Sequence, residues 1–264
     1  MRGLNSLLSK LNSNKDAMKK IRNMLLVACA IVCSLPAFAA DGGLNVELGA
    51  SHKFNKQWNM SAAISFRSRN NFRTADSFTG EIAASYKPLK WLRFSAGYSL
   101  LVDNNREKLT VHEDFSYNNW RKSYWGTRHR VQVGVTGSYK VHRVTLSLRE
   151  MWQYTYRPEK TNLDNFDFDE GVWEKVSRRG KGKNELRSRI GADWDIPHCK
   201  FTPFAMAEAV TTKSFDKLRL TVGTEYTLKR RHVFEAFYRY QHVFDDDDYD
   251  VTSHIIGVGY RFRF

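Results

Sequence analysis

The chain has 264 residues, of which 42% are hydrophobic, 14% aromatic and 27% charged, and its formal net charge is +14. The mean hydropathy of -0.54, and the absence of an apolar run of about 20 residues after the first forty, exclude a protein that crosses a membrane with several helices. Membrane-crossing strands remain compatible with this composition, because their apolar and polar residues alternate and cancel in the average.

Residues 1–39 have the features of an export signal. A basic segment from Met18 to Asn23 precedes an apolar segment from Met24 to Leu35. Ala37-Phe38-Ala39 then supplies the small residues that a signal peptidase reads. We therefore expect translation from Met18 and cleavage before Ala40.

The cysteines are compatible with export. Leu26-Val27-Ala28-Cys29 also fits a lipoprotein cleavage box, although cleavage there would leave an apolar mature N-terminus. Cleavage before Ala40 removes Cys29 and Cys33 and leaves Cys199 alone. An exported chain with one thiol has no internal disulfide framework, so backbone pairing and packing must hold it together.

From residue 44 onward, apolar and polar residues alternate along most of the chain. Every second residue is apolar from Trp58 to Phe66, and the same pattern returns from Leu92 to Leu100. A period of two predicts strands with two unlike faces. Eleven such segments start near residues 44, 57, 77, 90, 127, 142, 184, 200, 217, 231 and 252.

Two segments depart from this alternation. Residues 200–212 are apolar on both faces, and Glu150 falls on the apolar face of its strand. A β-bulge turns a side chain to the other face of a sheet, so we expect a bulge near Glu150.

Strand length distinguishes a soluble sandwich from a membrane barrel. Sandwich strands average about five or six residues, whereas most of these segments reach the length of about 9–11 residues that crosses a bilayer at a tilt. An open sheet edge in lipid would leave backbone groups unpaired, so the sheet must close. Aromatic residues also lie near the segment ends, as they do in interfacial girdles: Trp58, Tyr86, Trp91, Tyr139, Trp152, Tyr154, Tyr156 and Trp194.

These observations predict an all-β protein, with residues 40–264 forming a closed antiparallel transmembrane β-barrel of ten to twelve strands. Eleven is an odd number, whereas bacterial barrels normally have an even number of strands. Either the first segment, Leu44 to Phe54, is not a full crossing and the barrel has ten strands, or a hairpin hidden in a long loop makes twelve.

The connections between segments alternate in length, which predicts the orientation of the barrel. Short connections are typical of periplasmic turns, and long ones of extracellular loops. The short connections are Lys87–Lys90, Lys140–His142, Ile196–Cys199 and Lys229–Arg231. The long ones are residues 102–126, residues 158–184 and Asp245–Asp250.

The C-terminus carries a specific signal. Ile256, Val258, Tyr260, Phe262 and Phe264 place an apolar residue at every second position up to the last residue. Gly259-Tyr260-Arg261-Phe262 with the terminal Phe264 resembles the C-terminal strand that the barrel-assembly machinery of Gram-negative bacteria reads.

A repeated unit of strand, short lysine-rich turn with a Trp, and strand occurs at Phe54–Trp58 and again at Tyr86–Trp91. Gly-Tyr pairs follow at Gly97-Tyr98 and Gly259-Tyr260. Over residues 44–264 the chain thereby resembles a family of small outer-membrane barrels classed only as a domain of unknown function. The resemblance implies the barrel fold and a place in the cell outer membrane, but no reaction.

The alternation turns many basic side chains towards the interior of the barrel. The basic residues expected in the lumen include Arg67, Arg69, Arg93, Arg130, Arg149, Arg219, Arg239 and Arg261, and the acidic ones include Glu81, Glu225 and Glu235. Two interpretations stay open. A narrow barrel can be filled by such side chains as they pair with one another, or a positive lumen can attract small anions as a channel does.

The sequence offers little for catalysis or metal binding. Ser253 and His254 lack the third partner of a hydrolase, and His198-Cys199 provides two ligands where zinc needs about four. We therefore expect no metal and no cofactor. A lipid- or envelope-modifying enzyme, with rim residues such as His254 in its site, is the alternative to a structural or channel role.

The remaining partners follow from charge and location. The acidic runs Asp245–Asp250 and Asp164–Glu170 are expected in solvated loops, although they could hold Ca²⁺ or bridge lipopolysaccharide through divalent ions. Outer-membrane lipid, lipopolysaccharide and the assembly machinery are the expected partners. Nucleic acid is not expected, because the basic residues are spread over strands of an exported chain.

Overall fold

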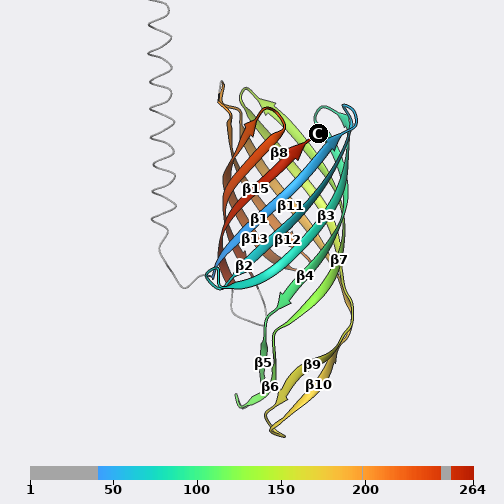
Figure 1. Ribbon diagram of the computed structural model, residues 1–264, viewed down its shortest axis with the longest axis vertical. Coiled ribbons are helices and arrows are strands. Elements are labelled where there is room, and N and C mark those ends of the chain that lie inside the picture. Colours follow the sequence, from blue (N-terminus) through green and yellow to red (C-terminus); the bar gives the residue numbers. More distant parts are fainter. Residues whose placement is uncertain (1–40, 198, 245–250) are drawn as a thin grey trace, which may run out of the picture. The chain divides into compact units, whose positions relative to one another are not determined.

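A computed structural model describes residues 41–197, 199–244 and 251–264. The expected signal peptide, His198 and the acidic segment 245–250 lie outside the described residues. Eleven long strands of 11 to 18 residues form one closed barrel (Figure 1). They are β1 (Asp41–Lys53), β2 (Trp58–Arg69), β3 (Thr74–Leu89), β4 (Leu92–Asn105), β7 (Tyr124–Val141), β8 (Val144–Arg157), β11 (Lys181–Trp194), β12 (Phe201–Thr211), β13 (Phe215–Leu228), β14 (His232–Val243) and β15 (Val251–Arg263).

The prediction of a closed transmembrane barrel is confirmed, and each of the eleven alternating segments corresponds to one wall strand. Ten neighbouring pairs are antiparallel, but the closing pair is parallel, with Asp41 opposite Ser253 and Ser51 opposite Arg263. The expectation of a wholly antiparallel wall is therefore wrong for this pair. With an odd number of strands that run alternately up and down, the first and last strands point the same way.

Neither route to an even number of strands occurs in the described part of the chain. β1 is a full crossing that pairs with β15 on one side and β2 on the other. The extra strands of the long loops stay out of the wall and form a separate four-stranded sheet in the order β10-β9-β6-β5. These strands are β5 (Lys108–Val111), β6 (Tyr117–Arg121), β9 (Lys160–Asp167) and β10 (Val172–Arg178).

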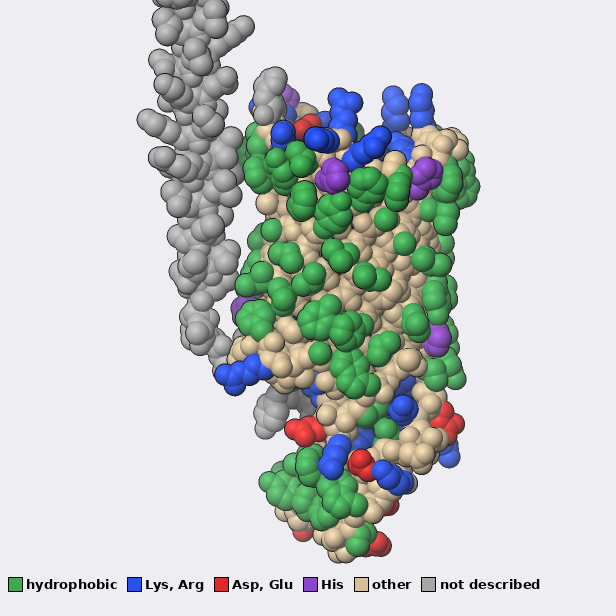
Figure 2. Space-filling view, viewed as in Figure 1, with side chains coloured by type: hydrophobic (Ala, Val, Ile, Leu, Met, Phe, Trp, Pro, Cys, Tyr) green, Lys and Arg blue, Asp and Glu red, His purple; other side chains and the backbone are tan. Residues whose placement is uncertain are grey.

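The period-two pattern sorts side chains between the outer and inner faces of the wall. Many large apolar side chains on the outer face are 40% or more exposed, which suits contact with lipid rather than with water. Figure 2 shows them as a broad apolar band on the face of the barrel in view. The described residues contain no helix that could span a membrane. Representative outward residues are Leu48, Ile64, Ile82, Phe94, Val133, Leu148, Ile190, Val222, Phe234 and Ile256.

Histidine side chains lie towards both ends of this band (Figure 2), and each of the two described next contacts a tyrosine. His232 contacts the hydroxyl of Tyr260 near the short turns at 2.9 Å, and Tyr98 contacts His129 on the opposite half of the outer face at 2.7 Å. Rings with one polar tip suit the boundary between lipid and water.

The structure explains the two segments that depart from alternation. The pairing of β8 with β7 and with β11 continues past Glu150 without a shift of register. The expected bulge is therefore absent, and that prediction is wrong. Glu150 stays on the outer face, where the hydroxyl of Ser188 donates a hydrogen bond to it at 2.6 Å. β12 is apolar on both faces because its inward side chains, including Phe204 and Val210, fill the lumen.

Candidate functional site

The half of the lumen next to the short turns is hollow. Two adjoining cavities of about 600 and 720 Å³ share Glu81, Lys87 and Arg93 in their linings. We call this space the vestibule. Its lining includes Arg230 and Arg231 of the β13–β14 turn, so the hollow reaches the end of the barrel where the short turns lie.

The lining of the vestibule is strongly basic. Ten basic side chains face four acidic ones, Glu47, Glu81, Asp193 and Glu225. The basic ones are Lys53, Lys56, Lys87, Arg93, Arg149, Arg189, Arg230, Arg231, Arg261 and Arg263. Small inward residues such as Ser61 leave the space open between these long side chains.

Towards the loops, the lumen is narrowed by a cluster of charged side chains around Glu208. This carboxylate is 5% exposed and pairs with Arg187 at 2.7 Å, Arg219 at 3.0 Å and Arg149 at 3.1 Å. We call these three arginines and Glu208 the arginine layer. One carboxylate cannot neutralise three guanidinium groups, so the layer keeps a positive charge inside the wall.

Neutral groups hold the arginines of this layer in place. Gln153, which is 1% exposed, accepts a hydrogen bond from Arg187 at 3.2 Å. Gln241 accepts one from Arg219 at 2.8 Å. Because amide oxygens satisfy the donors without adding negative charge, the positive excess persists.

Aromatic side chains fill the lumen beside the arginine layer. Phe204 and Phe237 point inward and lie over two glycines of the wall, Gly223 and Gly257. A Cβ atom on Gly257 would overlap the ring of Phe237. Arg239 lies over the same ring, with its guanidinium carbon 4.9 Å from the ring centre, which favours a cation–π contact. The glycines therefore provide the space that these rings occupy.

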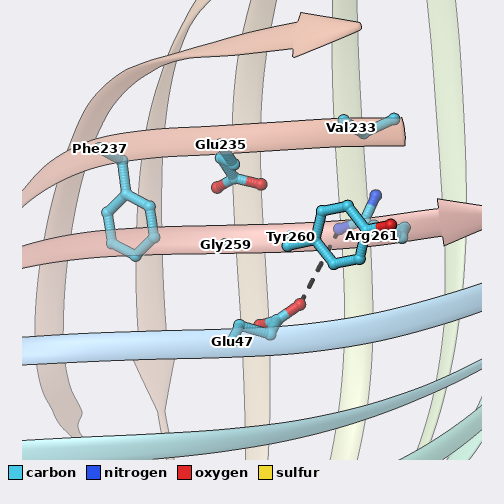
Figure 3. A pocket seen from close by; sticks show the side chains of 7 residues that line it. All are labelled: Glu47, Val233, Glu235, Phe237, Gly259, Tyr260 and Arg261. Atoms are coloured by element: carbon cyan, nitrogen blue, oxygen red, sulfur yellow. Dashed lines mark ion pairs between the residues drawn. The ribbon is translucent and has the colours of Figure 1, made fainter. Parts of the chain in front are cut away.

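Figure 3 shows a second, much smaller pocket at the closing seam of the wall. Its volume is about 20 Å³, which suffices for little more than one water molecule. Arg261 lies 3.9 Å from Glu47 across this pocket, and Glu235 points into it from β14 (Figure 3). Arg261 and Glu47 lie close to a partner of opposite sign, and the pocket has no room for a ligand larger than water.

The structure distributes the residues expected in the lumen over several places. Arg93, Arg149, Arg261, Glu81 and Glu225 line the vestibule, and Glu235 lines the small seam pocket.

Arg219 belongs to the arginine layer, and Arg67 and Arg239 lie close enough to Arg219 to repel it. Arg130 donates a hydrogen bond to Thr155 at 3.3 Å. Arg69 pairs with Asp76 at 2.9 Å near the loops, so it lies outside both the vestibule and the layer.

Glu208, the centre of the layer, was not predicted from the sequence as a lumen residue. It lies in the segment that is apolar on both faces, where alternation gives no inward side. The available signal was that Glu208 is the one charged residue between Phe201 and Thr211. A charge isolated in an apolar strand needs partners from other strands, and three arginines supply them here.

The C-terminal residues of the expected assembly signal occupy both faces of β15. Gly259 lies on the inner face between Glu47 and Glu235, where an added Cβ atom would make ordinary contacts. Tyr260, Phe262 and Phe264 are on the outer side near the short turns, and the rings of Phe262 and Phe264 meet edge to face at 4.8 Å.

The enzyme alternative gains no support from the geometry. Ser253 and His254 are adjacent in β15, so their side chains point to opposite faces of the wall. His254 bonds instead to the hydroxyl of Tyr238. Among the described residues, no three His, Cys, Asp or Glu side chains are grouped so that they could hold a metal ion.

The acidic residues of the loop sheet have partners within the chain. Asp164 binds Lys175 at 2.5 Å, and this hydrogen bond lowers the pKa of the Asp164 carboxyl. Asp169 contacts His112 at 3.0 Å. Asp167 accepts hydrogen bonds from the backbone N–H groups of Asp169 and Glu170.

A closed wall of long strands, an apolar outer band and a charged interior define this protein as a transmembrane β-barrel. Residues 44–252 match the model of a family described as protein of unknown function (DUF2490). The chain belongs to this family. No curated protein matches the sequence significantly.

Solved structures of other barrels resemble this fold at low sequence identity. The β domain of the Bordetella autotransporter BrkA is 12% identical with a TM-score of 0.50, and the match covers 80% of this chain and 86% of that one. The NanC porin is 12% identical with a TM-score of 0.44, over 76% of this chain and 85% of that one. At this identity, the likeness concerns the fold alone.

Proposed function

We propose that this protein is an outer-membrane barrel whose lumen forms a narrow channel for small anions. The observation that carries the proposal is the charge of the vestibule, where ten basic side chains face four acidic ones. A walled cavity of one predominant sign concentrates counter-ions, because its low-dielectric wall focuses the field along the lumen.

The arginine layer is the constriction of this channel. An anion that leaves the vestibule meets Arg149, Arg187 and Arg219, which share the single carboxylate of Glu208. A small anion can replace Glu208 as the partner of one arginine and then move to the next. Rings of arginine select anions in this way, and the tight filling of the layer implies a small conductance.

The proposed orientation places the vestibule on the periplasmic side and the four-stranded loop sheet outside the cell. Three features support it: the short turns at one end, the export signal expected in residues 1–39, and the C-terminal residues Gly259 to Phe264. In this setting the apolar band contacts outer-membrane lipid, the loop end meets lipopolysaccharide, and the assembly machinery reads β15.

The test is conductance of the refolded barrel in planar bilayers under a salt gradient. We expect small openings with a reversal potential of the sign that anion selectivity produces. Glu208→Gln should raise the anion preference, because it removes the only negative charge of the layer. The complete absence of openings would show a filled barrel with a structural role, and cation selectivity would also contradict the proposal.

A further inference from the structure

The outer face of the barrel carries one feature that neither the fold nor the lumen explains. Glu150 lies at the middle of β8, on the outward side with Leu148 and Trp152. The other outward positions in the middle of the described wall strands hold no charged side chain. A carboxyl group is thus directed at the centre of the apolar band.

Lipid cannot satisfy this carboxyl group. The hydroxyl of Ser188 on β11 donates one hydrogen bond to Oε2 of Glu150 at 2.6 Å. In hydrocarbon an ionisable side chain is costly and normally has a polar partner. The pair of Glu150 and Ser188 therefore indicates that this part of the band is covered by something other than acyl chains.

The outward residues that flank Ser188 are large on the β8 side, which we call the ridge, and small on the β12 side, which we call the groove. β8 forms the ridge with Leu146, Leu148 and Trp152, which are 44 to 54% exposed. β12 forms the groove, because its outward residues in register with β11 are three alanines, Ala205, Ala207 and Ala209. Small residues let two membrane segments approach closely enough for van der Waals contact and hydrogen bonding.

We infer that this face, formed by β8, β11 and β12, binds a second copy of the chain about a two-fold axis that passes near Ser188. A two-fold contact presents the same patch on both partners. Because the ridge and the groove flank β11 on opposite sides, the rotation brings the ridge of each copy to the groove of the other. The surface is self-complementary in shape.

The same rotation explains the polar group. It brings the two Glu150–Ser188 pairs together around one axis and withdraws them from lipid. Two carboxyl groups in a low-dielectric site can share a proton, and the two Glu150 side chains would then be joined by a hydrogen bond. A partner with a basic side chain is not required, and the outward residues of the described wall strands offer none at that depth.

The first test is cross-linking in lipid vesicles on a Cys199→Ala background. Ile190→Cys places a thiol on β11 beside the expected axis, whereas Ile64→Cys places one on β2, on the far side of the wall. Ile64→Cys is the matched control for Ile190→Cys, since both isoleucines point outward and Ile190 is 64% and Ile64 63% exposed. A short bis-maleimide should join Ile190→Cys into dimers and leave Ile64→Cys monomeric. Equal cross-linking of the two variants would overturn the inference.

The second test measures dimerisation by energy transfer between labelled barrels diluted into vesicles. Glu150→Leu should raise the dissociation constant of the dimer about ten-fold, as expected when one or two hydrogen bonds between membrane segments are lost. The substitution keeps the barrel folded, because leucine suits a lipid-facing site, and the heat-dependent gel mobility of the barrel verifies this. A wild-type barrel that stays monomeric, or an unchanged constant in Glu150→Leu, would contradict the proposal.

Discussion

The two halves of the lumen are built from the same alternating strands, yet one is hollow and the other is filled. Around the vestibule, small inward residues such as Ser61, Ser95 and Ser147 leave space between the basic side chains. At the arginine layer, inward positions carry arginine, glutamine and phenylalanine, and the lumen narrows. In a barrel of fixed strand number, the size of the inward side chains decides where the lumen is open.

The halves also differ in how their charges are balanced. The carboxylate of Glu208 is enclosed and serves three arginines at 2.7 to 3.1 Å. In the vestibule, the pair of Glu47 and Arg261 is 3.9 Å apart, with side chains 41% and 37% exposed. Enclosed charges stabilise the fold through their partners, whereas exposed ones mainly set the electric field.

Replacing Glu208 should have the largest effect, because it breaks the filled half at its centre. Glu208→Gln leaves three enclosed arginines without a carboxylate, and we expect a loss of about 3–5 kcal/mol in the free energy of unfolding. Denaturant titration of the barrel in detergent measures this loss. Glu47→Gln in the vestibule is the matched control and should cost about 0–1 kcal/mol. Similar losses in both variants would contradict the distinction between the halves.

A methyl group on Gly257 tests how tightly the filled half is packed. Gly257→Ala directs a Cβ atom into the ring of Phe237, so we expect a destabilisation of about 1–3 kcal/mol. Gly137→Ala is the control, because no atom lies within 4 Å of the added Cβ. That change should stay within about 0.5 kcal/mol. The same unfolding titration compares the two variants, and an equal response would show that the rings over Gly257 are loosely held.

Reversing a charge in the hollow half should change selectivity and spare stability. Arg93 lines both cavities of the vestibule, where it has room to move. Arg93→Glu should lower the anion preference in the reversal-potential measurement while the unfolding midpoint stays within error. A large loss of stability would show that Arg93 stabilises the folded wall, and that its main role is not to set the electric field of the vestibule.

The smallest effect concerns an ion pair outside the lumen altogether. The hydrogen bond from Lys175 lowers the pKa of Asp164 in the loop sheet. Its contribution to stability is therefore complete above the pKa of the unfolded chain and is lost as the pH falls through the lower folded value. Amide exchange in β9 and β10 should rise over that acidic window, and less so in Lys175→Gln. An identical pH response of the variant would rule out this pair as the cause.

The wall could be predicted from the sequence because lipid outside and charge inside impose a period of two over whole strands. The parallel closure of β1 on β15 follows once all eleven segments are full crossings, but the usual even number of strands in bacterial barrels argued against that count. Strands of the loop sheet were missed because β5 has four residues and β6 has five, too short for a clear period.

The period of two also predicted part of the candidate site. Alternation identified the inward arginines. It could not show which of them form ion pairs, because pairing depends on residues far apart in sequence. Glu208 and Arg149 are 59 positions apart, on β12 and β8, which are not neighbours in the wall. Glu150 was expected to turn inward, whereas its partner Ser188, 38 residues later, allows it to remain outside.

The parallel seam between β1 and β15 has a consequence for the chain ends. Both strands start at the loop end of the barrel and finish beside the short turns, so Asp41 and Phe264 emerge at opposite mouths. Even-stranded barrels release both ends into one compartment. In the orientation proposed above, an epitope inserted directly before Asp41 should be stained on intact cells, whereas an antibody against the last residues should need a permeabilised envelope.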